Sequence, residues 1–145
     1  MKFDFSNLEM GSTSTVWLDL PEVSPRARVQ LRPATDANPA YFNAMMKRSG
    51  RQSRNMVRAE RFTAEELGRI RDDDRFLFPR YVVVGWDGIE DLDTKSDVPF
   101  SRQACEEFLN ALPDWVFDLI RNAASTPERF MPDGEGPDPE TISGN

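Results

Sequence analysis

The stretch YVVVGWDGIEDLDTKSDVPFSRQACEEFLNALPDWVFDLIRNAASTPERF, residues 81–130, decides the fold of this chain. It holds an apolar block, an acidic turn and two short amphipathic helices. Ser101 is the expected N-cap of the first helix, and Pro113 opens the second. Apolar residues at helical spacing predict the inner faces: Cys105, Phe108, Leu109 and Leu112 in the first helix, and Trp115, Val116, Leu119, Ile120 and Ala123 in the second, with Phe117 toward the side. A final turn after Thr126 is expected to bring Phe130 onto the core.

The apolar block at residues 81–86 allows two structures. Three consecutive valines favour a buried strand. The spacing of Leu77, Tyr81 and Val84 also allows a helix that continues through a kink at Pro79. From the residues alone, both structures stay open.

Upstream of this stretch, residues 15–20 and 26–32 alternate apolar and polar side chains and predict a β-hairpin. The turn between them is bounded by Pro21 and Pro25. The alternation places six residues inward: Val16, Leu18, Leu20, Ala27, Val29 and Leu31. It places Trp17 on the opposite face.

Two more helices are expected between the hairpin and the apolar block. The first begins with Asn38 as N-cap and Pro39 in its first position, buries Tyr41, Phe42, Met45 and Met46, and ends at Gly50. Residues 51–60 have weak periodicity and are predicted to be mobile or ordered by a partner. The second helix begins at a capping box formed by Thr63 and Glu66, and ends near Phe76 or Phe78, before Pro79.

These elements predict an α+β fold, a mostly helical body with a small N-terminal β-hairpin. Residues 1–13 are expected to form an arm whose Phe3, Phe5 and Leu8 dock on the body or on a partner. Residues 14–131 form the single domain, and the acidic residues 132–145 form a disordered tail.

The composition argues against catalysis and against a metal site. The chain has no histidine, which removes the usual general base near neutral pH and the commonest transition-metal ligand. Its one cysteine, Cys105, is expected to be a small core residue. We therefore expect no enzyme activity, no cofactor and no metal.

Two acidic motifs were weighed as cation sites. The turn at residues 87–97 lacks the glycine and the glutamate that an EF-hand loop requires, so we interpret it as a solvated turn. Residues 72–74 are consecutive aspartates of a helix whose side chains diverge, so we interpret them as a charged helix surface.

The net charge is −7, which argues against nucleic-acid binding, and no apolar run is long enough to span a bilayer. The charges are segregated, because residues 47–61 are basic and residues 87–97 are acidic. This asymmetry suits attraction of a charged partner, or closure of the basic segment onto the acidic one. Since the first residues carry no long apolar segment, the chain is expected in the cytosol.

An ordered set of short motifs resembles the tail assembly chaperones of long-tailed bacteriophages. The motifs are Leu31-Arg-Pro-Ala34, Asn38-Pro-x-Tyr41, Val83-Val-Gly-Trp86, Val98-Pro-Phe-Ser101, Phe108-Leu-x-x-Leu-Pro-Asp-Trp-Val-Phe-Asp118 and a terminal Phe130. The resemblance covers about residues 27–130 and leaves the arm and the Trp17 strand unmatched. It implies a small helical protein that binds the tape-measure protein and helps to recruit tail-tube subunits. It also implies action in the host cytoplasm, absence from the finished virion, no catalytic residues, and a helix rather than a strand over residues 79–86.

The candidate protein-binding residues are aromatic and basic side chains that a partner could contact if they are exposed: Tyr81, Trp86, Phe108, Trp115, Phe117, Arg51, Arg54 and Arg58. Self-association is left open. Two other functions are also left open. One is a structural or adaptor protein of the virion, at the neck or in tail completion. The other is an acidic inhibitor of a host nucleic-acid-binding protein, with carboxylates in place of phosphates.

Overall fold

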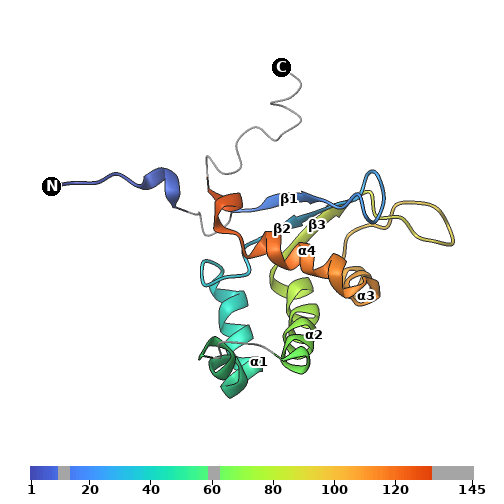
Figure 1. Ribbon diagram of the computed structural model, residues 1–145. Coiled ribbons are helices and arrows are strands. Elements are labelled where there is room, and N and C mark those ends of the chain that lie inside the picture. The colour runs from blue at the N-terminus through green and yellow to red at the C-terminus, as the bar shows by residue number, and fades with distance from the viewer. Residues whose placement is uncertain (10–13, 59–62, 132–145) are drawn as a thin grey trace.

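The fold is a small antiparallel sheet with the helices gathered on one side of it (Figure 1). The computed structural model describes residues 1–9, 14–58 and 63–131, and only the backbone within residues 50–58. The strands are β1 (Val16–Asp19), β2 (Arg28–Leu31) and β3 (Val83–Asp87), in the order β1-β2-β3. The helices, including two short 3₁₀ turns, are η1 (Ser6–Leu8), α1 (Pro39–Arg58), α2 (Ala64–Tyr81), α3 (Arg102–Ala111), α4 (Asp114–Ala124) and η2 (Pro127–Phe130). The predicted α+β class is confirmed, although a third strand from the middle of the chain completes the sheet.

The predicted hairpin forms with the expected faces. Leu18 of β1 pairs with Val29 of β2, and the inward residues of both strands are buried or partly buried. Trp17 lies on the opposite face of the sheet, where 41% of its surface is exposed. The helices therefore cover one face of the hairpin and leave the other open.

The resemblance-based prediction of a helix over residues 79–86 is wrong beyond Tyr81. Residues 83–87 form β3, which pairs antiparallel with β2, so the strand preference of the valines prevails. The prediction that α2 ends before Pro79 is also wrong, because the helix includes Pro79 and closes where the N–H of Val82 donates to the carbonyl of Phe78 at 3.0 Å. Pro79 lies in the last turn, where its missing N–H removes a single helical bond.

The predicted end of α1 at Gly50 is also wrong, because the helix continues to Arg58. A glycine ends a helix when it adopts a left-handed conformation, and inside a helix it costs only about 1 kcal/mol. The start of α1 is as expected, since the Asn38 side chain accepts from the N–H of Tyr41 at 3.4 Å. The same buried amide donates to the carbonyls of Pro33 and Tyr81 at 2.9 and 2.8 Å, which fixes α1 to the end of α2.

The predicted caps of α2 and α3 are confirmed. Thr63 accepts from the N–H of Glu66 at 3.1 Å, and the Glu66 carboxylate accepts from the N–H of Thr63 at 3.3 Å. Ser101 accepts from the N–H of Ala104 at 3.0 Å. Among the described residues, none of the helices is both long and apolar enough to cross a membrane.

The predicted orientation of α4 is wrong for its aromatic residues. Phe117 is fully buried and Trp115 is 60% exposed, whereas the sequence analysis placed Trp115 inside and Phe117 at the side. The Phe117 ring packs edge-on against Phe78 of α2, with ring centroids 5.5 Å apart. Tyr41 packs edge-on against the same Phe78 ring, so α1, α2 and α4 share one aromatic core. Phe130 of η2 is buried in this core as predicted.

Candidate protein-binding surface

Arg75 of α2 fixes the corner where α3 meets α4. Its guanidinium donates to the carbonyls of Leu109 and Leu112 at 3.3 and 3.0 Å, and to the Asp114 carboxylate at 2.9 Å. These bonds satisfy two carbonyls at the end of α3, where no further helical turn supplies N–H groups to donate to them. Asp114 also lies in the first turn of α4, where a carboxylate is favoured by the helix dipole. Arg75 therefore links the end of α3 to the start of α4, and Arg71 lies 3.8 Å from the same Asp114 carboxylate.

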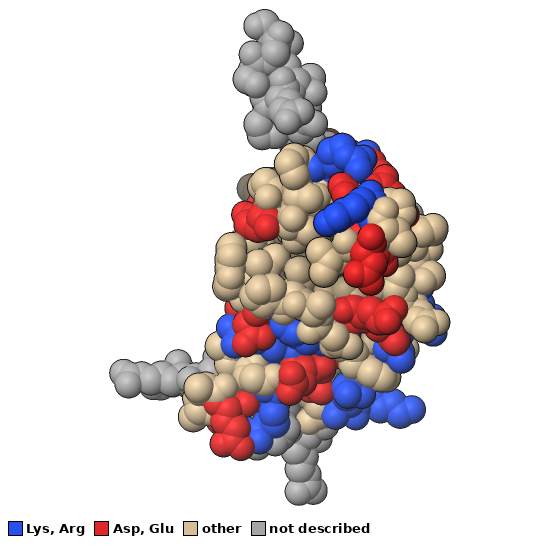
Figure 2. Space-filling view, turned by 90° about the vertical axis from the view of Figure 1, so that its right-hand side faces the viewer, with Lys and Arg blue, Asp and Glu red and all other residues tan. Residues whose placement is uncertain are grey.

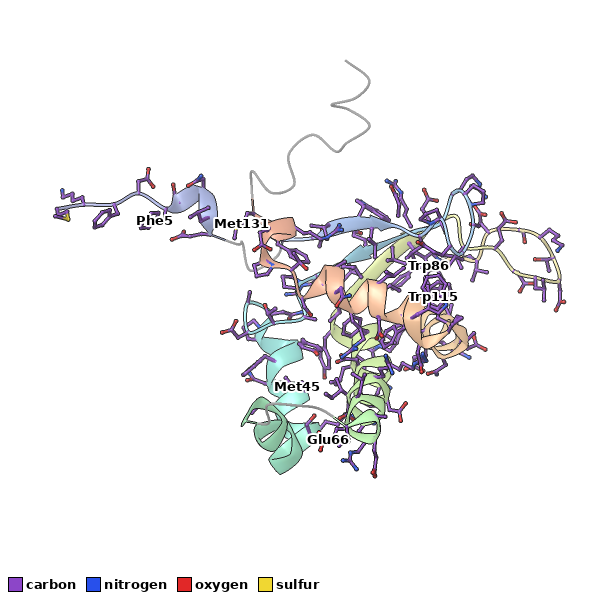
Figure 3. The ribbon with its side chains drawn as sticks, in the orientation of Figure 1. Phe5, Met45, Glu66, Trp86, Trp115 and Met131 are labelled. Carbon is purple, nitrogen blue, oxygen red and sulfur yellow. The ribbon has the colours of Figure 1, made fainter. Side chains whose placement is uncertain are left out.

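Trp115 stands on this corner with most of its indole exposed. It follows Asp114 directly, and no hydrogen bond or ring contact to it occurs among the described residues. Figure 3 shows Trp115 and Trp86 at the same end of the body, near α3. A large, mostly exposed aromatic side chain is a typical anchor for a partner.

A shallow hollow of about 420 Å³ lies between α2 and α3. It is lined by Asp72, Arg75, Phe76, Arg80, Glu106 and Asn110. Phe76 is 39% exposed, and the guanidiniums of Arg48 and Arg80 lie 3.9 and 3.7 Å from its ring centroid. Arg75 belongs both to this hollow and to the corner, so we treat the two as one corner–groove surface: Asp72, Arg75, Phe76, Arg80, Glu106, Asn110 and Trp115.

The charges near this surface are mixed in sign. Arg80 pairs with Glu106 across the hollow at 3.0 Å, and Arg48 pairs with Asp73 at 2.9 Å. In Figure 2 the basic and acidic side chains of one face of the molecule alternate, without a broad field of either sign. Such a face suits a polyanion less well than it suits a partner with an apolar stripe flanked by charges of both signs.

The region from residue 36 to residue 135 matches the YdaY prophage protein family. This chain belongs to that family. The match spans more than half of the chain and includes the whole corner–groove surface. Because the family is one of prophage proteins, the YdaY-family protein is phage-derived. Neither a curated protein nor a solved structure matches it.

A chain of charged bonds beneath the surface ties α1, α2 and α4 of the YdaY-family protein together. The Tyr41 hydroxyl donates to Asp74 at 2.7 Å, and Arg121 donates to Asp74 at 2.8 Å and to Asp118 at 2.9 Å. Arg71 donates to Asp118 through two nitrogens at 3.1 and 2.6 Å. Asp74 is buried, so its interpretation as part of a charged helix surface is wrong. It is the one aspartate of the three that faces α4.

The pKa values of the two aspartates in this chain of bonds shift in opposite directions. Burial raises the pKa of Asp74 above its usual range, and the bonds from Arg121 and Tyr41 only partly offset that effect. The bonds from Arg71 hold the pKa of Asp118 below its usual range. Burial also raises the pKa of Tyr41. Because the oxygens of Asp74 and Asp118 already accept bonds from neighbouring helices, the geometry suits the fastening of α1, α2 and α4 better than proton transfer to a substrate.

The candidate aromatic residues have different positions in the structure. Trp86 is half-buried, its indole N–H donates to the carbonyl of Val98 at 2.8 Å, and its ring packs edge-on against Phe100 and Phe108. Tyr81 is also packed against the core, and Phe117 has no surface that a partner could reach. Only Trp115 is presented openly to solvent. The side chains of Arg51, Arg54 and Arg58 lie outside the described residues.

Two arginines of the hairpin of the YdaY-family protein pair with acids of the acidic turn. Arg26 contacts Asp97 at 2.9 Å and Glu90 at 3.5 Å, and Arg28 contacts Asp87 at 3.7 Å. Closure of this turn onto residues 47–61 was one of two alternatives from the sequence, and Arg48 of that segment pairs with Asp73 instead. Within the described residues, no group of three or more acidic or cysteine side chains could hold a metal ion.

The exposure of Phe76 and Val84 was not predicted from the sequence. The sequence indicated Phe76 only as a possible last residue of a helix. Its exposure depends on the packing of α2 against α3, which the sequence pattern does not specify. Val84 is 41% exposed and follows buried Val83, at the point where the pairing of β3 with β2 shifts register.

Proposed function

We propose that this phage-derived protein is a tail assembly chaperone that binds the tape-measure protein and helps to recruit tail-tube subunits. Exposed Trp115, next to the corner that Arg75 fixes, is the observation that carries the proposal. Tape-measure helices carry long apolar stripes that need cover before assembly, and an indole beside a shallow groove suits such a stripe. The protein acts in the host cytoplasm as a binding protein without catalytic activity, cofactor, nucleic-acid or membrane partner.

Co-expression with the tape-measure protein of the same phage tests the proposal. We expect the chain to raise the soluble fraction of that protein and to co-purify with it. Trp115→Ala should weaken the complex by at least about 30-fold, as loss of a hot-spot tryptophan does. Trp17→Ala is the matched control, because it removes an exposed tryptophan from the opposite side and should leave binding unchanged. The proposal fails if the wild-type chain neither solubilises nor binds the tape-measure protein.

The arm favours a second function, a structural or adaptor protein of the virion. Phe3 and Phe5 are 71% and 60% exposed, and apolar arms of this kind are often ordered during assembly. Mass spectrometry of purified particles separates the two functions, because an adaptor is present in fixed stoichiometry and a chaperone is absent. The acidic-inhibitor function has less support, since arginines of the hairpin already pair with Asp87, Glu90 and Asp97.

A further inference from the structure

Among the residues that the structure describes, β1 is an edge strand of the sheet with no strand on its second side. It pairs with β2 on one side, and the strand order ends with it. The N–H of Leu20 donates to the carbonyl of Ala27 at 2.8 Å, and bonded pairs alternate along an antiparallel ladder. The backbone groups of Leu18 therefore face β2, while those of Trp17 and Asp19 point outward from the edge. An edge of this kind can accept a further strand.

The arm of the same chain has the side-chain alternation of a strand but is not paired. Met1, Phe3 and Phe5 alternate with Lys2 and Asp4. The rings of Phe3 and Phe5 are parallel with centroids 5.9 Å apart, so they share one side of an extended segment. All three apolar side chains are exposed, which costs free energy unless something covers them.

The arm is turned away from its own β1. The Asp4 carboxylate accepts from the backbone N–H and from the hydroxyl of Ser6 at 3.1 and 2.8 Å, and η1 follows immediately. Figure 1 shows the arm projecting past the start of β1, and Figure 3 shows Phe5 remote from the body. In this structure, the arm therefore does not lie on its own β1 edge.

We propose that residues 1–5 of one copy add as a fourth strand to the β1 edge of a second copy. The outward N–H and C=O groups of Trp17 and Asp19 would bond to the arm backbone. Met1, Phe3 and Phe5 would then cover Leu18 on the helix side of the sheet. Lys2 and Asp4 would lie on the outer face that carries Asp19, where Lys2 has the charge opposite to that of Asp19. This self-association is independent of the tape-measure assignment, because it needs only the chain itself.

Photo-cross-linking in isotope-mixed protein tests the proposal. The full chain carries benzoylphenylalanine in place of Phe5, and equal amounts of ¹⁴N and ¹⁵N protein are mixed and irradiated. Cleavage after Glu9 and Glu22 separates the arm, residues 1–9, from the peptide 10–22 that contains β1. We expect a cross-link between these two peptides in which one is heavy and the other is light. The proposal is overturned if every cross-link joins two peptides of the same isotope, or if the arm is cross-linked to other peptides. It is also overturned if no cross-link forms and the protein is monomeric at every concentration.

Asp19→Pro is the specific variant, because it removes an outward N–H and no bond to β2. It should abolish the mixed-isotope cross-link, whereas Asp19→Ala, which keeps the N–H, should retain it. If Asp19→Pro is unfolded by circular dichroism, deletion of residues 1–8 replaces it, since that deletion leaves the body unchanged. The deletion should abolish the concentration-dependent association that sedimentation velocity detects in the full chain. Association that persists in the deletion variant overturns the proposal.

Discussion

The guanidinium of Arg71 holds the Asp118 carboxylate through two parallel bonds, with Nε at 3.1 Å and Nη2 at 2.6 Å. This pair joins α2 to α4, and Arg121 extends it to the buried Asp74. Replacing either carboxylate, that of Asp118 or that of Asp74, therefore disturbs the same interface between α2 and α4. The two carboxylates have opposite pKa shifts, so pH distinguishes their contributions.

The first prediction concerns Asp118→Asn, which should lower the free energy of unfolding by about 2 kcal/mol at neutral pH. The pKa of Asp118 is lowered in the folded state, so its contribution is present above the unfolded pKa near 3.8 and is lost as pH falls through the folded pKa. The difference between wild type and variant should thus shrink below about pH 4. Urea unfolding across about pH 7 to about pH 3 measures it.

Asp74→Asn provides the contrast to this prediction. Because burial raises the pKa of Asp74 in the folded state, the wild type gains stability from this group as pH falls toward 3.8. The difference in unfolding free energy between wild type and Asp74→Asn should therefore grow on acidification. A difference that shrinks for both variants would mean that Asp74 is not desolvated as the structure has it.

The second prediction compares the two aromatic residues at the start of α4. Phe117→Ala should cost about 3 to 5 kcal/mol, because it empties a fully buried site between α2 and α4. Trp115→Ala should change the unfolding free energy by no more than about 0.5 kcal/mol, because its ring is 60% exposed. Chemical denaturation followed by circular dichroism measures both. Equal losses for the two variants would contradict the orientation of α4.

The sequence predicted much of the fold because local signals specify it. The capping box at Thr63, the Ser101 cap and the alternation of the hairpin depend on near neighbours, and the structure has all three. The errors arose where long-range packing decides. Phe117 rather than Trp115 is buried because Phe78 of α2 receives its ring, and β3 forms because β2 offers an unpaired side.

The candidate site was less predictable than the fold. Trp115 was selected as a binding residue for its type, although the apolar spacing placed it on the inner face of α4, and the structure leaves it 60% exposed. Phe76 belongs to the site because it lines the hollow between α2 and α3, where Arg48 of α1 and Arg80 of α2 both lie over its ring. The two arginines are 32 positions apart, so short-range pattern could not associate them.

The third prediction concerns Gly88, which follows β3. Its φ is +71°, and a Cβ there would lie 2.2 Å from the carbonyl oxygen of Arg26. Gly88→Ala should therefore cost at least about 2 kcal/mol, from the left-handed backbone together with the clash. Thermal unfolding measures the loss.

Gly68→Ala is the control for this substitution. A Cβ at Gly68 in α2 meets nothing within 4 Å, so alanine should stabilise the helix by about 0.5 to 1 kcal/mol. Opposite signs for the two glycine variants are the expected result. Stabilisation by Gly88→Ala would contradict the approach of the hairpin turn to the end of β3.

The last prediction concerns the thiol of Cys105, which lies fully buried on α3. Burial, with a smaller effect from Glu106, raises the pKa of this thiol to about 12. Since the thiolate is the reactive form, a disulfide reagent such as DTNB at about pH 8 should not modify the folded chain and should modify it fully in denaturant. Leu92→Cys adds an exposed thiol in the acidic turn and should show one fast-reacting group in the folded state. Rapid reaction of wild-type Cys105 without denaturant would mean that α3 separates from the core readily, and the corner that presents Trp115 would then not be rigid.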